Sequence, residues 1–240
     1  EGTSPTSGGV LASEKKRESP EIPPMDAEAL VEGNVAFGFD LYRSLAESRG
    51  DGNLFYSPYS ISLALAMTYG GARGATEEEM AEALHFTLSQ QALHPAFNRL
   101  DHVLEGRGEG AAGQDGEGFR LNIANAIWGQ KDYEFLSAYL DLLASNYGAG
   151  LRVLDFASAP EASRVTINDW VSQETEGKIE DLIPPGTIDP LARLVLTNAI
   201  YFNAAWANAF QEEATQEDPF TRLDGTQVSL PLMQQTESFG

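Results

Sequence analysis

One stretch, Leu194 to Phe202, constrains the fold of this chain more than any other. Its sequence, LVLTNAIYF, is almost continuously apolar, whereas a strand with one solvated face alternates apolar and polar residues. We therefore expect a central strand that is covered on both faces. Asn198 stands inside this strand, and because an unpaired buried amide costs about 1 to 3 kcal/mol, we expect its side chain to find partners.

The rest of the sequence predicts helices first, and then strands mixed with single helices. Between Asn34 and Glu47, apolar residues recur at helical spacing and predict an amphipathic helix. These residues are Val35, Phe39, Tyr42 and Leu45. Later helices are expected at about 60–69, 77–86, 93–104, 140–147 and 161–176, and later strands at 119–127, 151–154 and 228–232. No repeat is visible, so the order favours an α+β fold over a βαβ array.

Two local patterns predict where single elements begin or turn. Leu54 to Tyr56 is a candidate for a short buried strand. It is followed by Ser57 and Pro58, where a hydroxyl can cap a helix start and proline suits the first helical position. Near the other end, Asp224-Gly225 lies between alternating residues and predicts a β-hairpin.

Residues 1–33 differ in composition from the rest of the chain. They are rich in Gly, Pro, Ser, Thr and Glu and hold few large apolar groups that could offset the entropy of ordering. We expect a disordered polar tail over 1–33 and one domain over 34–240.

The charge of the chain excludes several classes of partner. The sequence has 15 Lys+Arg against 36 Asp+Glu, a formal charge of −21, with no basic stripe to compensate. Because nucleic acids and anionic membrane surfaces are bound through Lys and Arg, we expect neither as a partner. No apolar run approaches the ~20 residues that span a bilayer. With no cysteine, disulfides, thiol catalysis and Cys-based metal sites are also excluded.

Residues that could carry catalysis form no recognisable constellation. His85, His94 and His102 show no metal-binding spacing with a carboxylate, and we interpret them as solvated histidines on helix surfaces. The glycine-rich run 106–118 follows no strand and is acidic, so it is interpreted as a flexible loop rather than a phosphate site. We therefore expect no enzyme, no metal and no cofactor.

Six separated segments carry a pattern that is more specific together than any one of them alone. They are Asn53–Ser62, Gly71–Thr76, Ile123–Trp128, Asn168–Ile179, Leu196–Phe202 with Trp206, and Asp224–Pro231. In order and spacing these segments resemble the serpins from about Asn34 to Met233. The resemblance implies the serpin fold, in which a multi-helix N-terminal region surrounds a large central mixed β-sheet.

The resemblance also implies an activity. A serpin presents a reactive loop to a serine or cysteine protease, and after cleavage the loop inserts as a strand into the central sheet and distorts the enzyme. We expect the full-length protein to inhibit such a protease, to be extracellular and to be a monomer. The alternative is a serpin-fold binding or chaperone-like protein that never inserts its loop.

Four residues receive roles through the resemblance. Asn198, Ser57 and Ser60 match the shutter, a polar cluster beneath the point where strands separate, and Trp206 matches the breach, where the loop first enters. Simpler interpretations stay open beside these roles. Ser57 can serve as a helix cap, and Trp206 can fill the core.

The sequence departs from the family pattern where it ends. It stops at Gly240, so the hinge, the reactive loop with its scissile site and the closing strands are not in this chain. We expect the domain to be incomplete at its C-terminus, with an unpaired strand edge, and the fragment to be prone to aggregation and inactive as an inhibitor. The target protease cannot be read from the chain, because the specificity residue lies in the absent loop.

Overall fold

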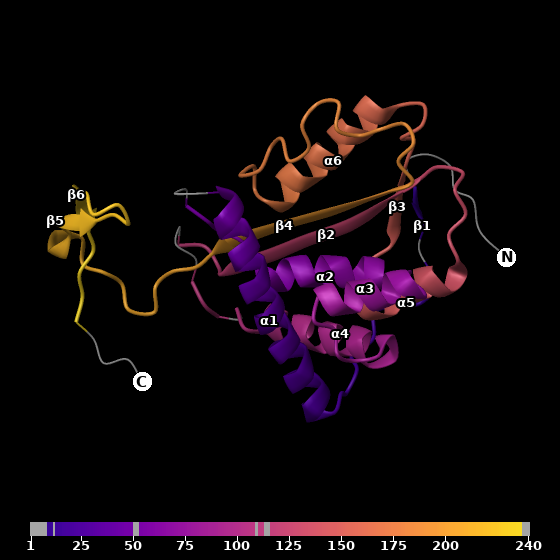
Figure 1. The fold of residues 1–240 in the computed structure, drawn as a ribbon, viewed down its shortest axis with the longest axis horizontal. Coiled ribbons are helices and arrows are strands. Elements are labelled where there is room, and N and C mark those ends of the chain that lie inside the picture. Colours follow the sequence, from indigo (N-terminus) through magenta and orange to yellow (C-terminus); the bar gives the residue numbers. More distant parts are fainter. Residues whose placement is uncertain (1–8, 12, 50–52, 109, 113–115, 237–240) are drawn as a thin grey trace. The chain divides into compact units, whose positions relative to one another are not determined.

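The computed structural model describes residues 9–11, 13–49, 53–108, 110–112 and 116–236. They divide into two compact units, each of which is described by itself. The larger unit combines helices with a four-stranded mixed sheet, as the α+β prediction requires (Figure 1). The smaller unit contains the described residues between 108 and 120 and from 203 to 236.

The larger unit is built in three layers. Its helices are α1 (Pro24–Arg49), α2 (Pro58–Tyr69), α3 (Ala75–Ala83), α4 (Gln90–Gly106), α5 (Ser137–Tyr147) and α6 (Pro160–Glu174). Its strands are β1 (Val10–Leu11), β2 (Arg120–Gln130), β3 (Leu151–Leu154) and β4 (Leu194–Asn203). Helix α6 covers one face of the sheet, and the other helices lie on the opposite side (Figure 1).

The strands lie in the order β1-β3-β2-β4. Strand β3 pairs antiparallel with β1 and parallel with β2. The predicted apolar strand is β4, and its side chains alternate between two cores. Leu194 and Leu196 pack with the helical layer, whereas Val195 and Ala199 pack with α6. The predicted cover on both faces is thus confirmed, but within the described sheet β4 is an end strand rather than a central one.

Helix α1 begins earlier than predicted. Pro24 suits the first turn because its missing N–H would be unsatisfied there, and Asp26 places a negative charge at the positive end of the helix. The buried apolar side chains of α1 are those of Leu30 and Phe37. Val35 and Phe39, which carried the predicted periodicity, are instead 53% and 62% exposed. The helix is confirmed, but the prediction of one apolar face is not, because apolar residues lie on both the buried and the exposed side of α1.

Two further predictions differ from the structure. Leu54 to Tyr56 form no strand, and Phe55 is 87% exposed. A strand needs a hydrogen-bonded neighbour, and the described residues supply none here. The disordered tail predicted over 1–33 also differs, because residues 9–11 and 13–33 form β1, a segment without regular secondary structure and the first turns of α1. The rest of that prediction, residues 1–8 and 12, lies outside the described residues.

The smaller unit contains the predicted hairpin. Strands β5 (Gln216–Thr221) and β6 (Gln227–Leu232) pair antiparallel along their full length. Gly225 has a φ of +83°, which is why the tight turn needs glycine. A short 3-10 turn, η1 (Glu212–Ala214), precedes β5.

His94 is buried between helices α4 and α5. It is 2% exposed, so its predicted place on a solvated surface is wrong, because α5 packs over this part of α4. Its Nδ1 lies 2.5 Å from the hydroxyl oxygen of Tyr147. Burial raises the pKa of Tyr147 well above its usual value, so the phenol stays protonated and one hydrogen bond joins the two side chains. Burial also lowers the pKa of His94 to about 4, with the nearby Arg73 guanidinium adding to the effect.

Acidification should therefore destabilise the larger unit through His94. The unfolded imidazole takes up a proton near pH 6.5, whereas folded His94 stays neutral down to about pH 4, so the unfolded state binds protons first as the pH falls. Through this group the unfolding free energy should fall by about 3 kcal/mol between pH 7 and pH 4, at ~1.4 kcal/mol per pKa unit. Urea unfolding at several pH values should show a weaker acid dependence for His94→Gln. The partly exposed His102→Gln is the control, and equal pH dependence in all three proteins would contradict the account.

Candidate functional site

A polar link joins the middle of β4 to helix α2 and strand β2. The Nδ2 of Asn198 lies 2.5 Å from the Oγ of Ser60 and 3.0 Å from its carbonyl oxygen, and 2.5 Å from the Oδ1 of Asn125. Ser60 is fully buried. The two amide hydrogens are therefore shared among three acceptors, and the expectation that Asn198 finds partners is confirmed.

Ser57 takes no part in this link. Its Oγ accepts a hydrogen bond from the backbone N–H of Ser60 at 3.3 Å and so caps the N-terminus of α2, with Pro58 at the first helical position. The structure thus brings Ser60 and Asn198 together and gives Ser57 the capping role. The shutter role of these three residues stays a prediction.

Asn125 is the member of the link that the sequence analysis missed. It stands on β2 between the buried residues Ala124 and Ala126. The signal was related to that for Asn198, namely an amide between apolar residues of a strand, although β2 also contains Asn122 and Gln130. Its Nδ2 is buried and has no partner among the described residues. The link is therefore not saturated, because the buried Asn125 amide nitrogen is an unused donor.

The opposite face of the sheet is attached to α6 by aromatic side chains. The Arg152 guanidinium of β3 lies 5.4 Å from the ring centroid of Trp128 and 5.0 Å from that of Trp170. The two indoles meet edge to face at 5.5 Å. Because Trp128 belongs to β2 and Trp170 to α6, these contacts hold the helix on β2 and β3. At β4 the Nε1 of Trp128 donates to Thr197 Oγ1 at 3.0 Å.

Trp206 lies in the smaller unit. It is 67% exposed and packs edge to face on Phe210, with ring centroids 5.3 Å apart. The interpretation as a core-filling side chain does not hold in this structure, because most of the indole is accessible. The breach role stays a prediction.

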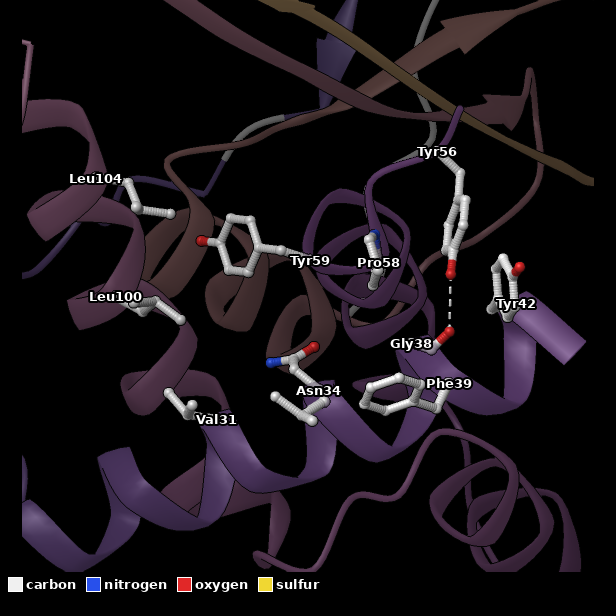
Figure 2. A pocket seen from close by; sticks show the side chains of 11 residues that line it. Val31, Asn34, Gly38, Phe39, Tyr42, Tyr56, Pro58, Tyr59, Leu100 and Leu104 are labelled. Atoms are coloured by element: carbon white, nitrogen blue, oxygen red, sulfur yellow. Dashed lines mark hydrogen bonds between the residues drawn. The ribbon is translucent and has the colours of Figure 1, made fainter. Parts of the chain in front are cut away.

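An apolar groove lies between α1, α4 and the start of α2, shown in Figure 2. Its volume is about 630 Å³, and the hydroxyl of Tyr56 donates to the carbonyl oxygen of Gly38 along one side at 2.9 Å. The lining residues include Val31, Val35, Phe39, Tyr42, Leu100 and Leu104. The exposed face of α1 is thus continuous with a larger apolar surface that the described residues leave uncovered.

The described part of the chain shows neither a metal cluster nor a membrane span. No group of three or more His, Asp or Glu side chains in it is arranged to hold an ion. Among the described helices, none is both long and apolar enough to cross a bilayer.

Comparison of the sequence with known proteins finds relatives in one family. The family model described as "Serpin (serine protease inhibitor)" matches residues 32–240. Leukocyte elastase inhibitor from Sus scrofa is 40% identical over 212 residues, which are 88% of this chain and 54% of the relative. The Homo sapiens protein of the same name is 37% identical over the same shares.

Solved structures agree with the sequence matches. Arabidopsis AtSerpin1, in a native stressed conformation, has a TM-score of 0.74 at 26% identity and covers 90% of this chain and 53% of its own. Ovalbumin from emu (Dromaius novaehollandiae) has a TM-score of 0.73 at 28% identity and covers 85% of this chain and 54% of its own. The chain thus spans about half the length of the proteins that it matches.

Double-mutant cycles should separate the cap from the polar link. Asn198→Ala and Ser60→Ala each remove one side of the same buried hydrogen bond, so their effects on unfolding free energy should be non-additive by about 0.5–3 kcal/mol. Ser57→Ala should cost about 1 kcal/mol as a lost cap. Because Ser57 and Asn198 both bond to Ser60, some coupling is expected, but it should be weaker than that between Asn198 and Ser60. Urea unfolding measures both cycles, and strong coupling between Ser57 and Asn198 would show that the cap is part of the link.

Proposed function

The chain belongs to the serpin family, and from this premise we propose that it is the N-terminal part of an inhibitor that traps a serine or cysteine protease by inserting its cleaved reactive loop beside β4. One observation carries the proposal. Strand β4 has the sequence of a central strand and is covered on both faces, yet it ends the described sheet. A strand of this kind at a sheet end has room for a further neighbour.

The polar link supports the same site. Asn198 holds the middle of β4 against α2 through Ser60, on the face of the sheet opposite α6. A strand that enters beside β4 passes this point, and the unpartnered Nδ2 of Asn125 is a donor in the same cluster. We propose that this cluster is the shutter, which holds the sheet before insertion and must rearrange when the sheet opens.

The attachment of α6 fits this movement. The Arg152, Trp128 and Trp170 contacts bind the helix to β2 and β3. Only the Trp128–Thr197 hydrogen bond of this group extends from these strands to β4. We propose that β2, β3, β4 and α6 move together when the sheet opens at the free edge of β4, so that these contacts stay intact.

The relatives named leukocyte elastase inhibitor indicate the class of target. Their name supports a protease of the elastase type as the first one to test. The expected extracellular location and the monomeric state of the full-length protein stay predictions.

The fragment alone is proposed to be inactive. Its apolar groove and the 87% exposed Phe55 leave hydrophobic surface in water, which favours self-association. We propose that the C-terminal part of the domain, present in the longer relatives, covers this surface and supplies the reactive loop.

Incubation with leukocyte elastase tests the proposal. The full-length protein should form a one-to-one complex that survives SDS, because the enzyme stays acylated to the inserted loop. The 240-residue chain should form none, and it should bind an apolar dye that the full-length protein does not. Cleavage of the full-length protein by elastase and by other serine and cysteine proteases, without any stable complex, would contradict inhibition and favour the binding or chaperone-like alternative.

A further inference from the structure

The segment that precedes α1 crosses the larger unit and adds a strand to its sheet. We call residues 9–11 and 13–18 the strap. Strand β1 pairs antiparallel with β3, and the backbone N–H of Val153 donates to the carbonyl oxygen of Gly9 at 2.9 Å. Leu11 is 8% exposed and belongs to the core between the sheet and α5. The family model begins at residue 32, so the strap lies outside the part of the chain that the family accounts for.

Arg17 anchors the strap to helix α4. Its Nε donates to Asn98 Oδ1 at 2.9 Å, and its two terminal nitrogens lie 2.6 Å from Asp101 Oδ2 and 3.0 Å from Glu105 Oε1. These three acceptors share one face of the helix because they are three and four residues apart. Asn98 is fully buried, and the other oxygen of Asp101 accepts from the Tyr59 hydroxyl at 3.2 Å. The guanidinium thus joins a hydrogen-bond network that also links Asp101 of α4 to Tyr59 of α2.

Backbone contacts extend the anchor to α5. The N–H of Glu18 donates to the carbonyl oxygen of Ser145 at 2.8 Å, and Asn98 Nδ2 donates to the carbonyl oxygen of Glu18 at 2.8 Å. Gly148, which ends α5 with a φ of +60°, leaves room for the Arg17 stem, because a Cβ there would lie 3.1 Å from Arg17 Cδ. The strap therefore contacts side chains of α4, and the backbone and terminal glycine of α5.

The strap also borders a polar cleft. The cleft has a volume of about 460 Å³ and is lined by Lys15 and Glu18 of the strap, by Arg73, and by residues of α4 and α5. Two of its lining residues, His94 and Ser145, have a buried Nε2 and Oγ that find no partner among the described residues. The receiving surface thus combines an open strand edge with a polar cleft.

We infer that the edge of β3 and the adjoining faces of α4 and α5 form a docking site for an extended segment, and that the strap is its occupant. An exposed strand edge is a template for pairing with another chain. The strap covers it with a two-residue strand followed by charged residues, which is a poor template itself. Within the described sheet, β4 then remains the end that can accept a further strand. The inference holds whether or not the protein inhibits a protease.

If this docking site exists, substitutions of two neighbouring residues of the strap should have very different effects on hydrogen exchange. Arg17 is the anchor, whereas Lys16 is exposed and carries the same charge. In the full chain, Arg17→Ala should raise the hydrogen-exchange rate of the Val153 amide at least tenfold, because that N–H is bonded to the strap. Lys16→Ala should leave it within twofold. Amides of α6 serve as the reference for unfolding of the whole unit.

A synthetic peptide of residues 9–23 tests docking directly. Added to the full chain that carries Arg17→Ala, it should restore protection of Val153 in a saturable manner. The same peptide with Lys16→Ala should do so equally well, and the peptide with Arg17→Ala should bind at least tenfold more weakly. If Arg17→Ala also unprotects α6, the full chain with Arg17→Lys is used instead, since it keeps the charge but loses the fork of donors.

Two outcomes would overturn the inference. One is unchanged exchange at Val153 in both Arg17 variants. The other is faster exchange that neither the unaltered peptide nor its Lys16→Ala form reverses, because the site would then not recognise the strap as a ligand.

Discussion

Cover on both faces of β4 is the constraint on which the rest of the larger unit depends. A strand without a polar face needs α6 on one side and the helical layer on the other, and its residues divide between the two cores in strict alternation. This fixes where α6 lies and which side of the sheet the other helices occupy. It also makes the end position of β4 unusual, because the edge of such a strand has hydrogen-bonding groups and no solvated face.

Polar groups determine how firmly β4 is held. The Asn198 amide bonds to Ser60 on α2 and to Asn125 on β2, whereas α6 is attached mainly to β2 and β3 through Arg152 and two indoles. At the opposite end of the sheet, β3 is paired with the strap and tied to α4 by Arg17. The two ends of the sheet thus differ. The β3 end is covered by the strap, whereas β4 is held by a small polar cluster that is incompletely paired.

The features that could be predicted from the sequence are those determined by residues close together in the chain. The apolar run of β4, the need of Asn198 for partners, the cap at Ser57 and the Asp224-Gly225 turn all depend on residues close together in sequence, and the structure confirms them. Asn125 could have been found by the same reasoning as Asn198. The serpin fold was predicted from six motifs in order rather than from any single pattern.

What the sequence did not reveal depends on contacts with distant segments. Phe39 and Val35 have helical spacing, but which side of α1 is buried depends on the layer that packs against it. His94 is buried because α5 covers α4, and the segment before α1 is ordered because Arg17 meets three acceptors about 80 residues away, as the sequence separations of 81, 84 and 88 show. A strand at Leu54 to Tyr56 needs a neighbour that the described residues do not contain.

The central claim is that β4 accepts an additional strand and that the full-length protein is more stable once it has done so. Thermal unfolding of the full-length protein, intact and after cleavage within its reactive loop, measures this most directly. The account predicts a higher unfolding temperature for the cleaved form. An equal or lower temperature after cleavage would show that no strand is added beside β4.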